Sequence, residues 1–182
     1  MTYLNRLYIL LAMLLSFQYS AVAFDREGYT LLGQARYRYW GFNLYDAAFF
    51  QRCGVNTNSG NTAEGSALDE NCSYILDLDY LRTFTPDNFK ESSEKILKRV
   101  ANENYDNIKG SFITFSDYFS TVGEGDRYTL KLTGEGVIEL YLNGDLAGSV
   151  RDREFAEAYF AIWLSEDGIN RRNAKVLRGS RG

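Results

Sequence analysis

The sequence contains no histidine, and this absence limits the chemistry that its side chains can perform. Without imidazole, Ser-His and Cys-His nucleophilic catalysis, the usual zinc sites and the commonest general base are excluded. No phosphate-binding loop is present, and Gly134-x-Gly136 in a predicted turn is not a dinucleotide fingerprint. We therefore predict neither a metal site nor a cofactor, and candidate chemistry depends on carboxylates, arginines and tyrosines.

Asp77 and Asp79 fall on one face of a predicted strand, about 7 Å apart, which is within the range of glycosidase carboxylate pairs. Alternating charges on a strand are more often a solvated surface, and this interpretation is favoured. Oxygen ligands of the kind that calcium binds are also present in one loop, at Glu64, Asp69, Glu70 and Asn71. The regular spacing of a calcium-binding loop is missing there.

Arg36 and Arg38 are stronger candidates, because they share one face of a predicted strand in a region rich in aromatic residues. A guanidinium group held by a sheet is a fixed fork for a carboxylate or an enolate. The alternative is an exposed strand arginine paired with an aspartate. Tyr45 and Tyr80 could add hydroxyl groups to such a site, although a tyrosine on the apolar face of a strand more often belongs to the core.

The N-terminal segment 1–23 has the features of a secretory signal peptide, since Arg6 precedes the short apolar run 7–17 and small residues lead up to Ala23. We predict cleavage after Ala23, a periplasmic location, and one mature domain over residues 24–182 with no membrane span. The alternative is an uncleaved N-terminal anchor. The chain has a net charge of −4, and loss of Arg6 makes the mature protein more acidic. Nucleic acid and anionic membrane surfaces are therefore poor partners.

Cys53 and Cys72 both belong to the predicted mature domain. An oxidising compartment favours their pairing as a structural disulfide. The bridge would close a loop rich in Gly, Asn, Ser and Thr, and it would stabilise the fold by about 3 kcal/mol in the chain-entropy model. Two free thiols or a redox pair are the alternatives, but the short CxxC spacing of a redox motif is absent.

The elements that position these residues follow from hydrophobic periodicity and turn signals. Predicted strands cover 28–39, 42–50 and 73–81, predicted helices cover 85–104 and 107–118, a three-strand meander covers 128–150, and two further helices follow Asp152 and cover 170–178. Asn143-Gly144 between apolar runs is a strong hairpin signal. This order of strands and helices predicts the α+β class, with an antiparallel sheet packed against helices.

Several segments occur in the order found in one known family: 33–38, 41–48, 76–82, 125–127, 142–144 with Gly148, and 155–164. With them the chain resembles the bacterial exported chalcone isomerase-like proteins, over almost the whole mature sequence. The resemblance implies an open-faced antiparallel sheet wrapped by helices, with a ligand cleft between the sheet and the helices.

The resemblance also assigns to Arg36 the arginine that holds a substrate oxygen in the isomerases or a fatty-acid carboxylate in binding relatives, with Arg38 as the alternative. The catalytic positions match poorly. Ala156 replaces an assisting hydroxyl, Ile96 replaces an asparagine, and the segment of the catalytic tyrosine is replaced by the loop between the cysteines. Loss of proton-transfer groups costs orders of magnitude in rate, so we expect the fold without an efficient isomerase.

The leading hypothesis is an exported, non-catalytic protein that binds a small amphipathic carboxylic acid, such as a fatty acid, with Arg36, Arg38, Tyr45 and Tyr80 as ligand-binding residues. One alternative is an isomerase or lyase acting on a phenolic or enone substrate, with Arg36 as electrophile and Tyr80 as acid or base. A second is a structural protein that docks a partner in the cell envelope.

Overall fold

The computed structural model describes residues 25–54 and 68–179. Its strands are β1 (Thr30–Tyr39), β2 (Phe42–Cys53), β3 (Cys72–Tyr80), β4 (Arg127–Leu132), β5 (Val137–Leu142) and β6 (Asp145–Arg151). Its helices are α2 (Pro86–Ala101), the 3₁₀ turn Asn102–Asn104, α3 (Tyr105–Ser116), α4 (Arg153–Leu164) and α5 (Arg171–Leu177). The predicted signal peptide 1–23 and the middle of the loop between the cysteines lie outside the described residues.

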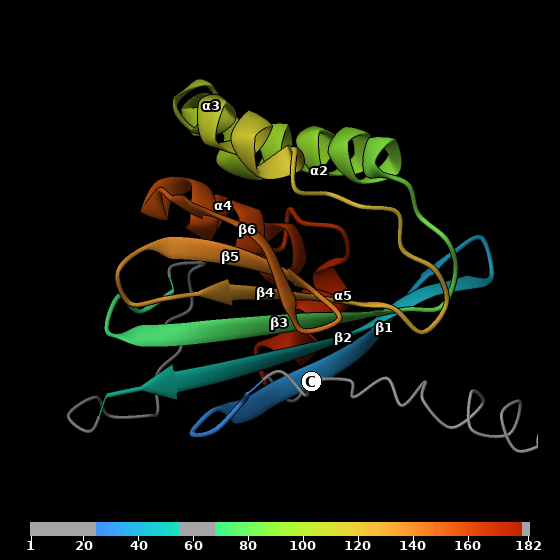
Figure 1. Ribbon diagram of the computed structural model, residues 1–182, viewed down its shortest axis with the longest axis horizontal. Helices are drawn as coiled ribbons and strands as arrows, with labels where there is room; N and C mark the ends of the chain where they lie inside the picture. The colour runs from blue at the N-terminus through green and yellow to red at the C-terminus, as the bar shows by residue number, and fades with distance from the viewer. Residues whose placement is uncertain (1–24, 55–67, 180–182) are drawn as a thin grey trace, which may run out of the picture.

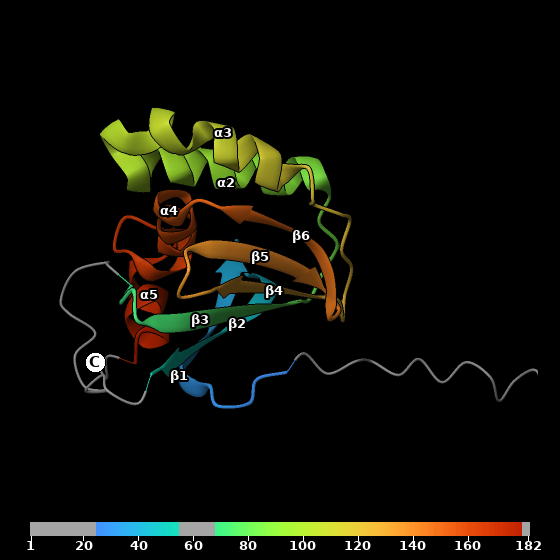
Figure 2. The same ribbon diagram turned by 60° about the vertical axis from the view of Figure 1, so that its left-hand side comes forward.

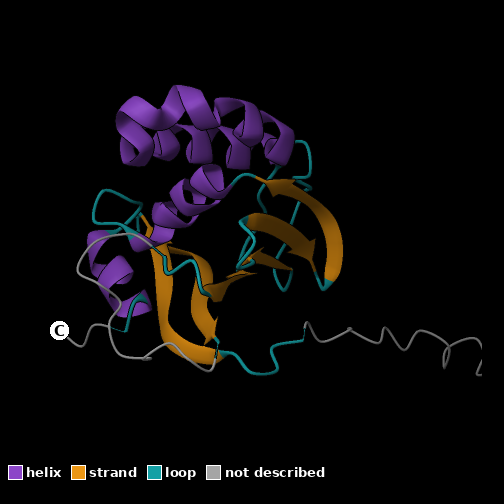
Figure 3. Ribbon diagram, turned by 90° about the vertical axis from the view of Figure 1, so that its left-hand side faces the viewer, coloured by secondary structure: helices purple, strands orange, loops and turns teal. Residues whose placement is uncertain are grey.

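The six strands form one antiparallel sheet in sequence order (Figure 1), as the α+β prediction requires. α2 and α3 form an outer layer, and α4 lies between them and the sheet (Figures 1 and 2). α5 packs beside the other end of the sheet, against β1 (Figure 2). The sheet is strongly twisted and curves around this cluster of helices (Figure 3).

Turn residues end the strands, and capping residues begin the helices, at positions that the sequence favours. Asn143 and Gly144 both have positive φ, 53° and 96°, as a two-residue hairpin turn demands. Thr85 accepts a hydrogen bond from the Asn88 backbone and forms a capping box at the start of α2. Asp152 caps α4 by accepting from the Phe155 backbone.

The boundaries differ from the sequence prediction at the junction of the first two helices. α2 ends at Ala101 because Asn102 has a φ of 48°, which no helix continues through. A single 3₁₀ turn follows, and α3 begins at Tyr105, two residues before its predicted start. The prediction of one helix to about Asn104 was therefore too long.

Cys53 and Cys72 form the predicted disulfide. They are register partners on β2 and β3, with Cα atoms 4.1 Å apart. The bridge therefore fixes the alignment of these two strands as well as closing the loop. Among the described residues, no helix is long and apolar enough to span a membrane.

Strand alternation gives β3 its buried side chains, but the face predicted to be wet is also covered. Leu76 and Leu78 point to the helices and are buried. On the opposite face, Ile75 and Asp77 are only 0% and 3% exposed. The prediction of a solvated face is wrong at these positions. At Asp77 the cover is Arg26, which reaches across the sheet from the segment before β1.

Close approach of α5 to β1 depends on Gly33. A Cβ atom at this position would lie 2.0 Å from the carbonyl oxygen of Val176 and 2.9 Å from the Cα atom of Leu177. Both obstacles are backbone atoms, which cannot turn away. Asn173 adds a side-chain hydrogen bond of 3.1 Å to the carbonyl of Arg36.

Gly33→Ala should therefore lower the free energy of unfolding by about 2 kcal/mol, as overpacking does, measured by urea denaturation. The matched control is Gly110→Ala, where an added Cβ meets nothing within 4 Å. Because alanine is a better helix former than glycine, this change in α3 should stabilise the protein by up to about 1 kcal/mol. Equal effects at both positions would contradict the packing argument.

Candidate functional site

A cavity of about 330 Å³ lies between the sheet and the helices, at the end of the sheet near the start of α2. Its floor comes from strands β1 to β5 and its roof from α2 and α4. The lining residues are mainly aliphatic and aromatic: Tyr39, Leu44, Tyr45, Leu78, Tyr80, Phe84, Phe89, Ser92, Ser93, Ile96, Phe119, Tyr128, Leu130, Leu140, Tyr159, Ile162, Trp163 and Ile169. None of these described residues is charged.

The hydroxyl groups around the cavity are largely engaged with neighbours. The Trp163 indole donates a hydrogen bond of 3.1 Å to the Tyr45 hydroxyl. The Tyr159 and Ser93 hydroxyls are 3.4 Å apart. For the Tyr80 hydroxyl, no hydrogen bond to another residue is found in the described part of the chain.

The buried phenol groups of Tyr45, Tyr80 and Tyr159 remain neutral at physiological pH. Burial raises the pKa of the Tyr45, Tyr80 and Tyr159 hydroxyls above the ordinary value of tyrosine. In each case desolvation is the largest cause. The cavity is therefore an uncharged, apolar container, suited to a hydrocarbon chain or an aromatic ring and not to an ionised group.

Tyr45 and Tyr80, predicted as site residues, come together at the cavity, with ring centroids 5.7 Å apart. Tyr37 stacks on Tyr45 from outside the lining. The contribution of α2 to the cavity was not predicted from the sequence. A signal for it is Ser93, a small polar residue in the apolar stripe of the helix, one turn from Phe89 and from Leu97. A large side chain at this position would fill part of the cavity.

Arg36 and Arg38, the other predicted ligand-binding residues, do not join Tyr45 and Tyr80. Tyr37 points to the helices, so strand alternation directs Arg36 to the opposite face. There Arg36 forms a bidentate ion pair with Asp46, at 2.6 and 2.7 Å. Arg38 is exposed and donates to the Asn43 side chain.

The lining of the cavity does not include these two arginines. The geometry matches the alternative considered for Arg36, an exposed strand arginine paired with an aspartate. A ligand-binding role for Arg36 or Arg38 stays a prediction, and the lining of the cavity gives it no support.

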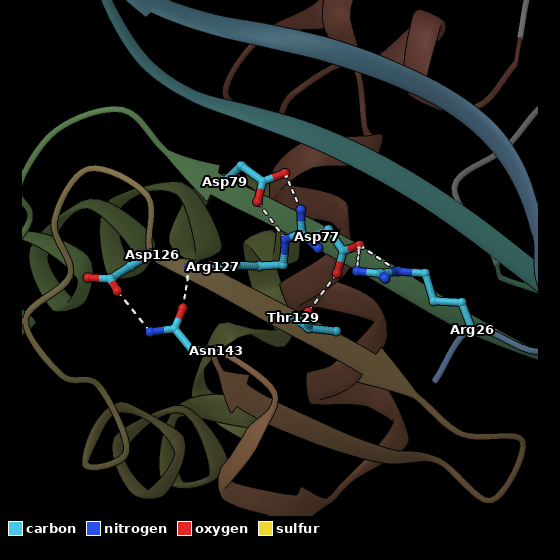
Figure 4. Close-up of polar contacts among 7 residues, drawn as sticks. All are labelled: Arg26, Asp77, Asp79, Asp126, Arg127, Thr129 and Asn143. Carbon is cyan, nitrogen blue, oxygen red and sulfur yellow. Dashed lines mark hydrogen bonds and ion pairs between the residues drawn. The ribbon is translucent and has the colours of Figure 1, made fainter. Parts of the chain in front are cut away.

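Asp77 and Asp79 belong to a network of ion pairs on the face of the sheet away from the cavity (Figure 4). Arg26 binds one oxygen of Asp77 through its Nε and Nη2 atoms, and Thr129 donates to the other oxygen at 2.6 Å. Arg127 binds both oxygens of Asp79. Because arginines occupy both carboxylates, the arrangement is that of a structural network and not of a glycosidase pair.

The same network extends to the β5–β6 turn. The Asn143 side chain accepts from the Arg127 backbone and donates to Asp126, each at 2.8 Å (Figure 4). Asn143 of the turn is thereby connected to Arg127 at the start of β4.

Metal binding finds no support among the residues that the structure describes, where no cluster of three or more histidine, cysteine or acidic ligands occurs. Of the calcium candidates, Asp69 accepts hydrogen bonds from the backbone and side chain of Asn71. Glu64 lies outside the described residues.

Comparison with known proteins adds a family and a fold. A family model described as chalcone isomerase-like matches residues 19–173. The crystal structure of a fatty-acid binding protein from Arabidopsis thaliana is similar, with a TM-score of 0.63 and 15% sequence identity, covering 86% of this chain and 90% of that chain. No curated protein matches significantly. The open antiparallel sheet with helices is the fold of this structural relative.

Arg26→Ala would leave the buried carboxylate of Asp77 without its cation, so it should lower the free energy of unfolding by about 3 kcal/mol. The side chain of Asp77 is only 4% exposed. The control is Arg36→Ala, which breaks an ion pair whose side chains are 45% and 39% exposed and should cost less than about 1 kcal/mol. If urea denaturation shows similar losses of unfolding free energy in the two variants, burial of the carboxylate does not determine the strength of the ion pair.

Stability should fall steeply in alkali, because the raised pKa of Tyr80 keeps its hydroxyl neutral in the fold while unfolded tyrosine ionises near pH 10. Above about pH 10 the folded state binds more protons than the unfolded state. The contribution of this group to the free energy of unfolding is therefore fully present below about pH 10 and declines above it. Each such tyrosine contributes a slope of about 1.4 kcal/mol per pH unit.

This slope can be measured from urea denaturation at a series of pH values. Tyr80→Phe removes one such group and should make the decline less steep. An unchanged slope in this variant would contradict the assignment.

Proposed function

We propose that this chain, which belongs to the chalcone isomerase-like family, is a non-catalytic binding protein for a small amphipathic carboxylic acid such as a fatty acid. The observation that carries the proposal is the cavity of about 330 Å³ between sheet and helices. This volume is at the lower end of the range for small-molecule sites, about 300–1,000 Å³.

The chemistry of the lining supports an apolar chain as the buried part of the ligand. Aliphatic and aromatic side chains dominate it, and its hydroxyls stay neutral. Burial of a hydrocarbon chain there contributes about 0.8 kcal/mol per methylene group. The structural relative from Arabidopsis thaliana is itself a fatty-acid binding protein, which favours the same ligand class here.

The enzymatic alternative has less support. An isomerase using Arg36 and Tyr80 needs both side chains in one site, but Arg36 is paired with Asp46 on the opposite face. A phenol whose pKa is raised by burial, as for Tyr80, is also a poor general base near neutral pH. The second alternative, a docking protein with its cleft filled by side chains, is disfavoured by the volume that remains.

Export is part of the same proposal. We place the mature domain at residues 24–182, in the periplasm, after cleavage behind Ala23. The Cys53–Cys72 disulfide supports an oxidising compartment. A protein partner in the cell envelope is a further element of the proposal.

Mass spectrometry on protein secreted from its full-length precursor tests these points together. The denatured protein should have the mass of a chain that begins at Phe24 with one disulfide. The native protein should carry one small acid, released on denaturation. A native mass without bound acid, together with no uptake of added dodecanoic acid, would contradict the binding proposal.

A cavity-blocking variant provides the matched test of location. Ile96→Trp on α2 adds bulk to the lining and should weaken dodecanoic acid binding at least about tenfold, that is by about 1.4 kcal/mol. Val100→Trp alters a half-buried residue one turn further along the same helix, outside the lining, and should preserve affinity. Equal affinities in both variants, measured by calorimetry, would place the ligand elsewhere.

A further inference from the structure

We propose that Arg82 and Lys95 form the carboxylate-binding part of the site, at the mouth of the cavity, and that the ligand lies with its chain inward and its head group in a groove between these two cations. This inference rests on the proposed function, since it orients the acid that the cavity would hold. Neither Arg82 nor Lys95 was predicted from the sequence as a ligand-binding residue.

The apolar lining makes a deep carboxylate unfavourable. An ionised group transferred from water into such a space needs a charged partner. The described lining offers only hydroxyls, and most of them already bond to neighbours. A carboxylic acid held by this cavity must therefore keep its charged end at the opening.

A polar groove adjoins the cavity and shares three of its walls, Leu44, Phe84 and Ser92. The remaining residues that line the groove are mainly polar or charged: Arg82, Thr83, Asn88, Glu91 and Lys95. Figure 1 shows the connection from β3 to α2, which carries Arg82, at the end of the sheet beside the start of α2. An apolar cavity that opens into a polar groove matches an amphipathic molecule with an apolar chain and a polar head group.

The two cations of the groove have no carboxylate partner among the described residues. Arg127, Arg36 and Lys131 on the sheet, by contrast, are each paired with an aspartate or a glutamate. Arg82 is held over the ring of Phe42, 5.2 Å from its centroid, which leaves the edge of the guanidinium available to hydrogen-bond an anion. Glu91 is the acidic residue of the groove, and its negative charge offsets one of the two positive charges, which leaves a net positive groove.

Two positive groups facing one carboxylate provide charge-assisted hydrogen bonds, the stronger kind. Because Arg82 and Lys95 are exposed, their attraction should be screened by salt. The acid should therefore bind about tenfold more tightly than an alcohol of equal chain length at low ionic strength, and this preference should shrink as salt is added.

Tryptophan fluorescence gives a direct readout. The sequence has two tryptophans; Trp40 is 84% exposed, whereas Trp163 lines the cavity. In a Trp40→Phe background, dodecanoic acid and 1-dodecanol are titrated against Trp163 emission at low and high salt. The Arg82→Gln/Lys95→Gln double variant should lose the preference for the acid and keep its affinity for the alcohol.

Two variants serve as comparisons. Lys90→Gln changes an exposed lysine of α2 outside the groove, and it should retain the preference. Arg36→Gln tests the arginine assigned by family resemblance, and it should also retain the preference.

Equal binding of acid and alcohol by the Trp40→Phe protein would overturn the head-group assignment while supporting the cavity. The head-group assignment would also be overturned if the preference survives in the double variant or disappears in Arg36→Gln. Binding of neither probe would overturn the proposed function together with this inference.

Discussion

The register of β3 is the constraint on which the rest of the structure depends. Its alternate residues belong to two different environments, with Leu76 and Leu78 against the helices and Asp77 against Arg26. A slip of one position would bring a carboxylate into the helix-facing core and a leucine onto the ion-pair face, because side chains alternate with a period of two. The disulfide joins register partners of β2 and β3, so this alignment is fixed covalently at one end and by a buried ion pair near its middle.

The same alternation separates charge from cavity. Around the cavity, the strand residues that point to the helices contribute apolar or phenolic groups, while Arg36 and Arg127 pair with aspartates on the far face. A charged group can therefore approach the cavity only from a loop or a helix, and the groove at its mouth is built in this way, from the β3–α2 connection and from α2. The neutral interior and the cationic rim are two results of one geometric rule.

Local signals were sufficient for most of the fold but not for the site. The Asn143-Gly144 turn, the Thr85 cap and the alternation of the strands act over a few residues, and the sequence predicted the elements in their observed order. The role of Arg36 was predicted from its strand and from resemblance, whereas strand alternation, with Tyr37 buried against the helices, directs Arg36 away from the cleft. The partner of Asp77 was not predictable, because Arg26 lies 51 residues away in a segment without periodicity. The cavity likewise depends on where Ser93 of α2 meets Tyr159 of α4, a contact that only the packed helices create.

The seating of α5 on β1 has a consequence for how the protein folds. The hydrogen bond between Asn173 and Arg36 joins residues 137 positions apart, and the backbone of α5 rests directly on Gly33. Contacts of such sequence separation are slow to form, because the entropy of closing the intervening loop is lost before any contact compensates for it. The packing of α5 on β1 can therefore form only after the whole stretch of chain between them is available.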